Sequence, residues 1–278
     1  MIASSGDSPS SIPPWGNCQP SPVFLLHQRI LPALLKITMP ALGLYNVVSI
    51  LYLKALTAIK NMKLVLFDLD DTLFDGDTEG RWVEYMYQNN LIKASDFFEK
   101  MKFFESEYRK GNLDVILYSE FLLSPLIGKC FSDVKNHIDS FVSDVVVRLT
   151  DDLTKELLDK HKDDTKVLTS GSLSFLVHKI SHKLGIENSF GTDPEYSDDK
   201  FTGRVDGVPN FSEEKVRRIK LWKGSKEFED ITAYSDSIHD LPLLEFSDNA
   251  IAVSPDDKLK EVALKRGWLI YEGRKSHS

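Results

Sequence analysis

Three carboxylates stand close together directly after an apolar run. In the stretch KLVLFDLDDTL, which begins at residue 63, Leu-Val-Leu-Phe is followed by Asp68, Asp70 and Asp71. The apolar run is short and uninterrupted, which predicts a strand that is buried on both faces. Carboxylates at the end of such a strand would lie at the edge of an open α/β sheet, where these folds place their binding sites.

The spacing of Asp68 and Asp70 suits the binding of a divalent cation or a phosphoryl group. Two carboxylates separated by one residue can approach the same ligand, and a bound cation relieves their mutual repulsion. An acidic turn that caps the following helix would give the same local pattern. Other motifs in the chain are needed to distinguish between these two interpretations.

A second strand end carries small polar residues. Residues 166–169 are predicted to form a strand that ends in Ser170, Gly171 and Ser172, at the start of a helix over residues 173–184. Backbone N–H groups at the start of a helix bind phosphate readily. Serine at a helix start is also common for capping alone, so this signal is weak by itself.

A third strand end adds further carboxylates. Residues 231–234 are predicted to form a buried strand, followed by Asp236 and Asp240, and Lys215 lies near the start of a helix over residues 212–222. Carboxylates together with phosphate and water oxygens suit Mg²⁺. No group of Cys or His residues has the spacing of a zinc site. The three strand ends together predict a phosphate site beside a magnesium site.

The elements that must position these residues fall into two kinds. After residue 165, strand and helix patterns alternate, which predicts a parallel sheet with helices on both faces. Residues 75–164 instead carry apolar residues at three- and four-residue steps, which predicts a bundle of about four helices. Because this bundle is inserted between the first two strands, we expect it to form a cap over the site.

Residues 1–61 differ from the rest of the chain. The first 22 residues are rich in Ser, Pro and Gly, which is typical of disorder. Residues 37–53 are uncharged and mostly apolar, but the segment is short and contains Pro40, so it is a marginal membrane span. We expect residues 1–61 to be a disordered extension or a mis-called start upstream of Met62, with a membrane-associated segment as the alternative.

The amino-acid composition indicates which kinds of molecule this protein binds. The net charge of −8 argues against a nucleic-acid surface, which would need a basic stripe. The two cysteines, Cys18 and Cys130, lie in unlike segments and indicate a reducing compartment without a disulfide framework. We therefore expect a cytoplasmic protein whose partner is a small phosphorylated molecule rather than a nucleic acid or a membrane.

The motifs in this order resemble those of a known superfamily. DLDDT at 68–72, Ser170, Lys215 and DSIHD at 236–240 are similar to the four motifs of the haloacid dehalogenase (HAD) superfamily phosphohydrolases. The helical insertion resembles the C1-type cap of subclass IB, which contains the phosphoserine phosphatases and histidinol-phosphatase-like proteins. The resemblance implies a Rossmann-like α/β core built from residues 62–74 and 165–278, and a helical cap from residues 75–164.

The resemblance implies a role for each matched residue. Asp68 would be the nucleophile that forms an aspartyl-phosphate, and Asp70 would act as general acid and then as general base. Mg²⁺ would be held by Asp68, Asp236 and the backbone carbonyl of Asp70. Asp240 would support the metal shell and orient the lysine of the third motif. The phosphate-binding groups would be Thr72, Ser170, Gly171 and Lys215.

We expect other roles or locations for several residues next to these motifs. Thr169 competes with Ser170 for the second motif. His239 is expected at the rim of the site or in solvent, and Asp71 at the helix start or in solvent. Asp77 and Glu79 either form an edge of the pocket or are ordinary charges at a helix N-terminus.

The function expected from this pattern is a Mg²⁺-dependent phosphomonoesterase that acts on a small metabolite, with histidinol phosphate and phosphoserine as candidates. A phosphotransferase that uses the same covalent step with an alcohol acceptor is an alternative. A phospho-acceptor signalling module is another, although such modules lack an acid two residues after the nucleophile. The sequence makes no choice between the substrates and predicts no oligomeric state.

Overall fold

The computed structural model describes residues 62–92 and 95–272. The segment at residues 37–53 that resembles a marginal membrane span lies outside the described residues. Within the described part of the chain, none of the helices combines the length and apolarity needed to cross a bilayer.

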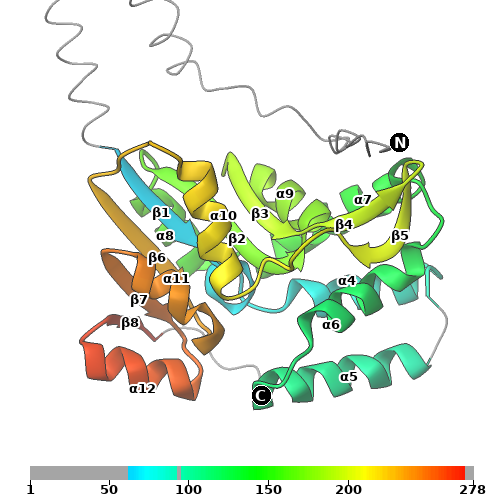
Figure 1. Cartoon of the computed structure of the whole chain (residues 1–278), viewed down its shortest axis with the longest axis horizontal. Coiled ribbons are helices and arrows are strands. Elements are labelled where there is room, and N and C mark those ends of the chain that lie inside the picture. The colour runs from blue at the N-terminus through cyan, green and yellow to red at the C-terminus, as the bar shows by residue number, and fades with distance from the viewer. Residues whose placement is uncertain (1–61, 93–94, 273–278) are drawn as a thin grey trace, which may run out of the picture. The chain divides into compact units, whose positions relative to one another are not determined.

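A six-stranded parallel sheet forms the centre of the fold, in the order β3-β2-β1-β6-β7-β8 (Figure 1). The α/β fold with a parallel central sheet is therefore confirmed. The first strand pairs with β2 on one side and with β6 on the other, which explains why its sequence is apolar without alternation. The strands are β1 (Lys63–Phe67), β2 (Thr165–Leu173), β3 (Asn188–Thr192), β6 (Asp230–Ser235), β7 (Asn249–Val253) and β8 (Leu269–Tyr271).

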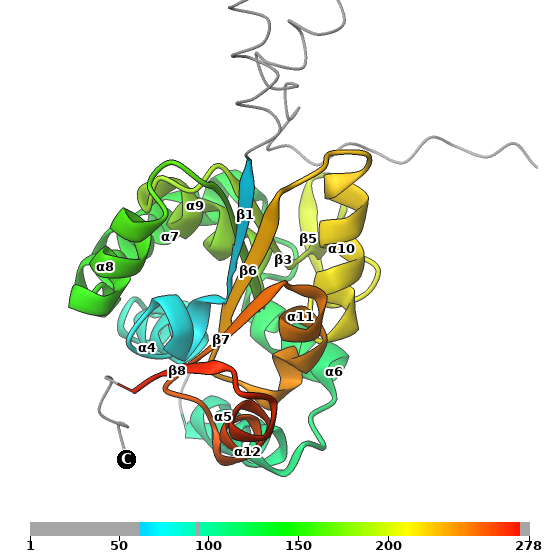
Figure 2. The ribbon, with the colours of Figure 1, turned by 90° about the vertical axis from the view of Figure 1, so that its left-hand side faces the viewer.

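Helices cover both faces of this sheet (Figure 2). Successive side chains of β1 enter different cores: Val65 and Phe67 belong to one apolar cluster, and Leu64 and Leu66 belong to the other. The first cluster includes residues of α9 (Ser174–Lys183), and the second includes residues of α10 (Glu213–Lys223), α11 (Leu241–Phe246) and α12 (Asp257–Arg266).

The insertion between β1 and β2 is helical, as its periodicity indicates. Its elements are α4 (Thr78–Gln88), α5 (Ser95–Lys110), α6 (Val115–Leu123), the short η3 (Ser124–Leu126), α7 (Phe131–Leu149) and α8 (Asp152–Lys160). The Trp82 ring of α4 lies 5.1 Å from Phe141 of α7 and 6.4 Å from Phe175 of α9, centroid to centroid. Because Phe175 follows β2, this aromatic contact joins the insertion to the sheet.

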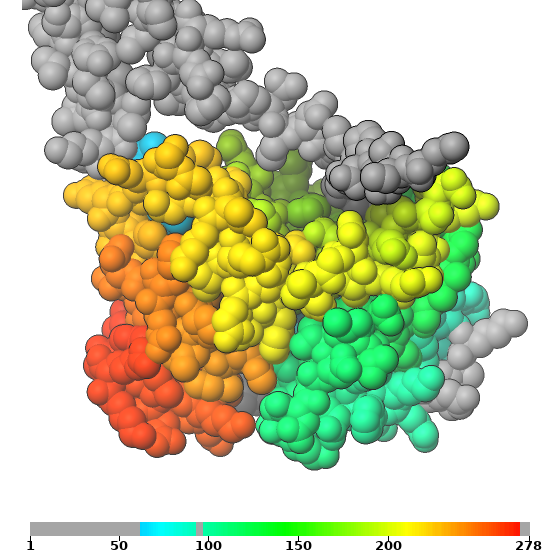
Figure 3. All heavy atoms as spheres, in the orientation of Figure 1, coloured from blue at the N-terminus to red at the C-terminus, as the bar shows by residue number. Residues whose placement is uncertain are grey.

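An antiparallel pair, β4 (Pro194–Ser197) and β5 (Lys200–Val205), extends from the sheet toward the insertion. The backbone of Phe201 exchanges hydrogen bonds with Gly128 and Lys129, which follow η3. A Cβ at Gly203, where φ is +86°, would collide with Ile127. The contact between this yellow hairpin and the green segment of α6 is visible in the space-filling view (Figure 3).

The predicted strand over residues 166–169 is too short. Strand β2 continues through Ser170–Ser172 to Leu173, and α9 begins at Ser174, one residue after the predicted helix start. The register with β3 shifts between Thr169 and Leu173, yet Leu173 still pairs with Thr192, so the neighbouring strand keeps the segment extended. These serines therefore lie on a bulged strand end, and a helix N-terminus does not provide their N–H groups.

We expect Trp82→Ala to lower the free energy of unfolding by about 3–5 kcal/mol, because it empties a fully buried aromatic site. Trp82→Phe should cost less, since the indole Nε1 has no hydrogen-bond partner to lose among the described residues. Urea denaturation followed by circular dichroism measures both. Leu221→Ala, at a side chain that is 68% exposed, is the control and should change stability by about 0.5 kcal/mol or less. Equal losses for Trp82→Ala and the control would contradict the assigned packing.

Candidate active site

The chain leaves β1 in a tight turn, η2 (Leu69–Leu73), which sets the direction of the acidic residues. Leu69 and Leu73 are fully buried and anchor the turn, while Asp71 adopts φ +55° and is exposed. Asp71 thus faces solvent, one of its two expected locations. The N–H of Asp68 donates to the carbonyl of Tyr234 on β6, at 3.1 Å, which holds Asp68 at the end of the two central strands.

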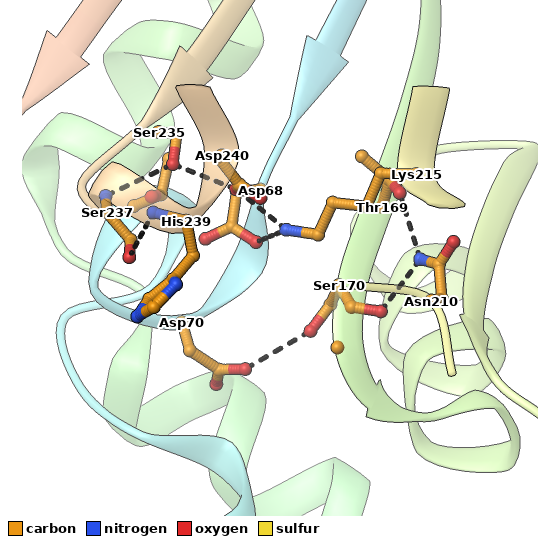
Figure 4. Close-up of polar contacts among 12 residues, drawn as sticks. Asp68, Asp70, Thr169, Ser170, Asn210, Lys215, Ser235, Ser237, His239 and Asp240 are labelled. Carbon is orange, nitrogen blue, oxygen red and sulfur yellow. Dashed lines mark hydrogen bonds and ion pairs between the residues drawn. The ribbon is translucent and has the colours of Figure 1, made fainter. Parts of the chain in front are cut away.

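Lys215 bridges two buried carboxylates (Figure 4). Its Nζ lies 2.7 Å from Asp68 Oδ1 and 2.7 Å from Asp240 Oδ2. All three residues are at most 7% exposed. Burial alone would lower the pKa of Lys215, but the charges of Asp240 and Asp68 raise it above its ordinary value, so the lysine remains protonated. Asp240 also accepts a hydrogen bond from Ser235 Oγ at 2.9 Å.

Negative charge exceeds positive charge in this cluster. Burial raises the pKa of Asp68 to about 7, although Lys215 opposes the shift. Burial and then the charges of Asp68 and Asp71 hold the pKa of Asp236 well above its ordinary value. One lysine therefore faces several carboxylates, and additional positive charge would stabilise their ionised forms.

Thr72 connects the loop after β1 to the loop after β6. Its hydroxyl donates to Asp236 Oδ1 at 3.0 Å and accepts a hydrogen bond from the Asp236 N–H at 2.9 Å. Thr72 is fully buried. The structure thus gives Thr72 a role in positioning Asp236, and its direct contact with phosphate stays a prediction.

Asp70 is held by three hydrogen bonds. The Thr78 N–H donates to Oδ1 at 2.7 Å, and the hydroxyls of Ser172 and Ser170 donate to Oδ2 at 2.9 Å and 3.3 Å. Burial, followed by the charge of Asp77, raises the pKa of Asp70 to about 6. A carboxyl group with such a pKa can both donate and accept a proton near neutral pH. Ser172, which lies beside Ser170 in the predicted motif and had no expected role of its own, makes the shorter of the two serine contacts.

The structure distinguishes Ser170 from Thr169 at the second motif. Ser170 Oγ points toward Asp70, whereas Thr169 Oγ1 points to the other side and accepts a hydrogen bond from Asn210 Nδ2 at 3.0 Å. The geometry therefore favours Ser170 as the residue that faces the site.

The oxygen donors at the two strand ends fit a hard divalent cation. Asp68 and Asp236 supply carboxylates, and the excess negative charge around them is the condition that a cation relieves. Among the described residues, no three His, Cys, Asp or Glu side chains form a metal-binding group. The predicted set remains compatible with this finding, because its third protein ligand is the backbone carbonyl of Asp70.

A helix of the insertion reaches the loop that follows β6. Tyr108 of α5 has its hydroxyl 2.8 Å from Ser237 Oγ. The His239 ring lies between two aromatic rings, with centroids 4.8 Å from Tyr108 and 5.0 Å from Phe211. His239 is half-buried between these rings, so its location agrees with the expected rim position, whereas the involvement of Tyr108 was not expected.

Glu79, the second residue of α4, is buried. Burial and then the charges of Asp77 and Asp70 hold the pKa of Glu79 well above its ordinary value, despite a hydrogen bond with Tyr118. Asp77 caps the same helix by accepting hydrogen bonds from the N–H groups of Glu79 and Gly80. Of the two acids, Glu79 is therefore the better candidate for a pocket edge, and Asp77 is a helix-capping residue.

A separate cavity of about 550 Å³ lies against β1, β6 and β7, and its lining includes Lys160, His161, Tyr234 and Trp268. His161 Nε2 lies 2.8 Å from the Tyr234 hydroxyl. None of the predicted site residues lines this cavity. It is therefore distinct from the carboxylate cluster at the strand ends.

Comparison with known proteins identifies relatives of this chain. Residues 65–245 match the family described as haloacid dehalogenase-like hydrolase. A histidinol-phosphatase of Neisseria meningitidis is 29% identical over 214 residues, which cover 74% of this chain and 96% of that protein. The phosphoserine phosphatase SerB1 of Mycobacterium tuberculosis is 27% identical over 216 residues, covering 75% of this chain and 70% of that protein.

The fold also matches a solved structure. A protein of unknown function from Bordetella pertussis superposes with a TM-score of 0.70 at 28% sequence identity. The match covers 77% of this chain and 99% of that one. The similarity therefore extends over both the sheet and the inserted helices.

We expect Lys215→Met to lower the free energy of unfolding by about 3–5 kcal/mol, because it leaves two buried carboxylates without their cation. Urea denaturation at neutral pH measures the loss. Lys220→Met, at an exposed lysine of the same helix, makes the same chemical change and should cost only about 1 kcal/mol or less, the contribution of its contact with the Phe246 ring. A Lys215→Met protein as stable as Lys220→Met would show that the buried bridge does not hold the loops together.

Proposed function

We propose that this chain hydrolyses a small phosphate monoester through a phosphorylated Asp68. The chain belongs to the haloacid dehalogenase-like hydrolase family and is a phosphatase of that family. The observation that carries the proposal is that two acids after β1 meet groups from two other elements: Asp68 pairs with Lys215 of α10, and Asp70 accepts a hydrogen bond from Ser170 of β2. We further propose Mg²⁺ as the cofactor, held by Asp68, Asp236 and the carbonyl of Asp70.

The first step is attack by a carboxylate oxygen of Asp68 on phosphorus. Lys215 occupies Oδ1 of Asp68, which leaves Oδ2 as the attacking atom. The bond from phosphorus to the ester oxygen breaks as the bond to Oδ2 forms. Bound Mg²⁺ would supply the positive charge that lets an anionic nucleophile approach an anionic phosphate. Lys215 adds a second positive charge beside the phosphoryl oxygens.

Asp70 transfers the proton in both steps. In its protonated form it donates to the departing ester oxygen and releases the alcohol. The resulting carboxylate then takes a proton from water as the water attacks phosphorus, and the bond to Asp68 breaks to release phosphate. The hydroxyls of Ser170 and Ser172 hold Oδ2 of Asp70, and they orient the carboxyl group for both transfers.

We propose a substrate that carries an amine as well as the phosphate. Glu79 is a buried acid with a raised pKa, so a cationic group beside it would restore its ionised form and gain a charge-assisted hydrogen bond. Two relatives are named as a histidinol-phosphatase and a phosphoserine phosphatase. In both histidinol phosphate and phosphoserine, a primary amine is bonded to the carbon next to the one that carries the phosphate.

We also propose that residues 75–164 act as a cap over this site. Tyr108 of α5 touches Ser237 and His239, and Glu79 of α4 is near enough to Asp70 for that charge to raise the pKa of Glu79. Both helices belong to the insertion, so closing it would surround the substrate with residues from both parts of the chain. A covered site favours small substrates over phosphoproteins.

The full chain should release phosphate from an amine-bearing monoester in the presence of Mg²⁺, and Asp68→Asn should abolish release. The asparagine amide is a poor nucleophile and carries no charge for the metal. Phosphate release from a panel that includes histidinol phosphate and phosphoserine, with and without Mg²⁺, measures this.

Asp71→Asn is the matched control, because it makes the same change at the exposed neighbouring carboxylate, and it should retain most of the activity. Folded wild-type protein that releases no phosphate from any member of the panel would overturn the proposal. Transfer to an added alcohol with little phosphate release would favour the phosphotransferase alternative.

We expect Glu79→Gln to raise KM for amine-bearing monoesters by about 10- to 100-fold, since a charged hydrogen bond contributes about 1.5–3 kcal/mol. Hydrolysis of p-nitrophenyl phosphate, which has no amine, should change by less than about threefold on the same reasoning. Steady-state kinetics on the two substrates separates the effects. Glu84→Gln, at an exposed glutamate of the same helix, is the control. A uniform loss on both substrates would indicate a structural role for Glu79 instead.

A further inference from the structure

Side chains hold the backbone carbonyl groups of Ser170, the predicted phosphate-binding serine, and of the next residue, Gly171. The Ser170 carbonyl accepts a hydrogen bond from Asn210 Nδ2 at 2.9 Å, and the Gly171 carbonyl accepts one from Thr192 Oγ1 at 2.6 Å. Both lie where the register between β2 and β3 shifts. Side-chain donors therefore fix the backbone at a point where the strand pairing is irregular.

The side chain of Asn210 contacts its neighbours through its NH₂ group. It is fully buried, and Nδ2 also lies 3.0 Å from Thr169 Oγ1 and 3.2 Å from the Phe190 carbonyl. Carbonyl oxygens only accept hydrogen bonds, so the NH₂ group must face them. Its Oδ1 has no partner among the described residues, although an unpaired buried acceptor is unfavourable. The NH₂ contacts therefore account for an amide at this position.

Thr192 completes the support. Its hydroxyl donates to Gly171 and accepts a hydrogen bond from the Asn210 N–H at 3.1 Å. The two residues come from different segments, since Thr192 ends β3 and Asn210 precedes α10, which carries Lys215. The same small network thus connects the second motif to the segment that leads to the lysine.

The direction of the Ser170 carbonyl determines where the Gly171 N–H points. In a trans peptide unit the C=O and the following N–H point in opposite directions, and the described chain contains no cis peptide bond. Ser170 presents its carbonyl to Asn210 on one side and its hydroxyl to Asp70 on the other (Figure 4). The Gly171 N–H is therefore directed toward the side of Asp70 and the nucleophile.

We propose that Asn210, supported by Thr192, is a positioning residue that orients the Gly171 N–H toward a phosphoryl oxygen. This inference rests on the proposed function, because it assumes that a phosphoryl group binds between Asp68 and Ser170. Asn210 does not touch the substrate and acts only through the peptide plane. Without its NH₂ group, the Ser170–Gly171 peptide is free to rotate, and the N–H leaves its phosphate-binding direction.

Asn210→Asp tests the proposal in the full chain with Mg²⁺ present. The change keeps the size of the side chain but replaces the donor by an oxygen that repels two carbonyls. We expect kcat to fall about 100-fold, as when a preorganised backbone donor is lost or misplaced. We also expect inhibition by orthovanadate to weaken by at least tenfold. A change of less than threefold in both, in folded Asn210→Asp protein, would overturn the proposal.

The threonine provides a second test that does not depend on the folding of Asn210→Asp. Thr192→Val removes the hydroxyl and should lower kcat about tenfold or more, whereas Thr192→Ser keeps it and should restore kcat to within about twofold of wild type. If Thr192 were purely structural, kcat of the variants would follow their thermal stability and not the presence of the hydroxyl. Equal activity of the serine and valine variants would contradict the proposal.

The amide resonance of Gly171 separates this inference from the proposed function. Titration of the wild-type protein with inorganic phosphate should shift the ¹⁵N–¹H signal of Gly171, and Thr192→Val should greatly reduce the shift. A wild-type protein that shows the shift but hydrolyses no monoester would end the proposed function and leave the positioning role standing. Phosphate that binds elsewhere and leaves Gly171 unshifted would overturn the positioning role.

Discussion

The ion-pair bridge from Asp68 through Lys215 to Asp240 is the interaction on which the rest of the site depends. These residues come from the end of β1, from α10 and from the loop after β6, so one ammonium group joins three separate segments. Burial makes the bridge necessary, because either carboxylate would otherwise be ionised without a partner or would be neutral. It also leaves one oxygen of Asp68 available, which is what a nucleophile requires.

Hydrogen bonds between side chains and loop backbone set the remaining directions. Thr72 both donates to and accepts from Asp236, and Thr78 donates its N–H to Asp70. Asn210 and Thr192 hold the two carbonyls of the second motif in the same manner. Each bond fixes the direction of a group at the site, and Thr78, Asn210 and Thr192 lie outside the four motifs. Part of the preorganisation of the site therefore comes from residues that are not in the motifs.

The inserted helices are joined to the sheet by apolar and aromatic contacts at some distance from the carboxylates. Trp82 packs against Phe175, and the hairpin of β4 and β5 bonds to the segment after η3. Closer to the site, Tyr108 contacts Ser237 through its hydroxyl and His239 through its ring. The insertion is thus joined to the rest of the chain both by apolar packing and by a polar and aromatic contact beside the carboxylates.

The sequence by itself determined the parallel sheet, the central position of β1 and the meeting of Asp68, Lys215 and Asp240, because uninterrupted apolar runs are local signals and parallel strands end at one edge. It ended β2 at residue 169, four residues too early, and it did not indicate the contact of Ser172 with Asp70 or any role for Asn210, Thr192 or Tyr108. Only the tertiary structure decided these, since each acts through a hydrogen bond to a residue distant in the chain. Ser170–Ser172 remains extended because β3 lies beside it, and no local propensity of Ser or Gly encodes that neighbour.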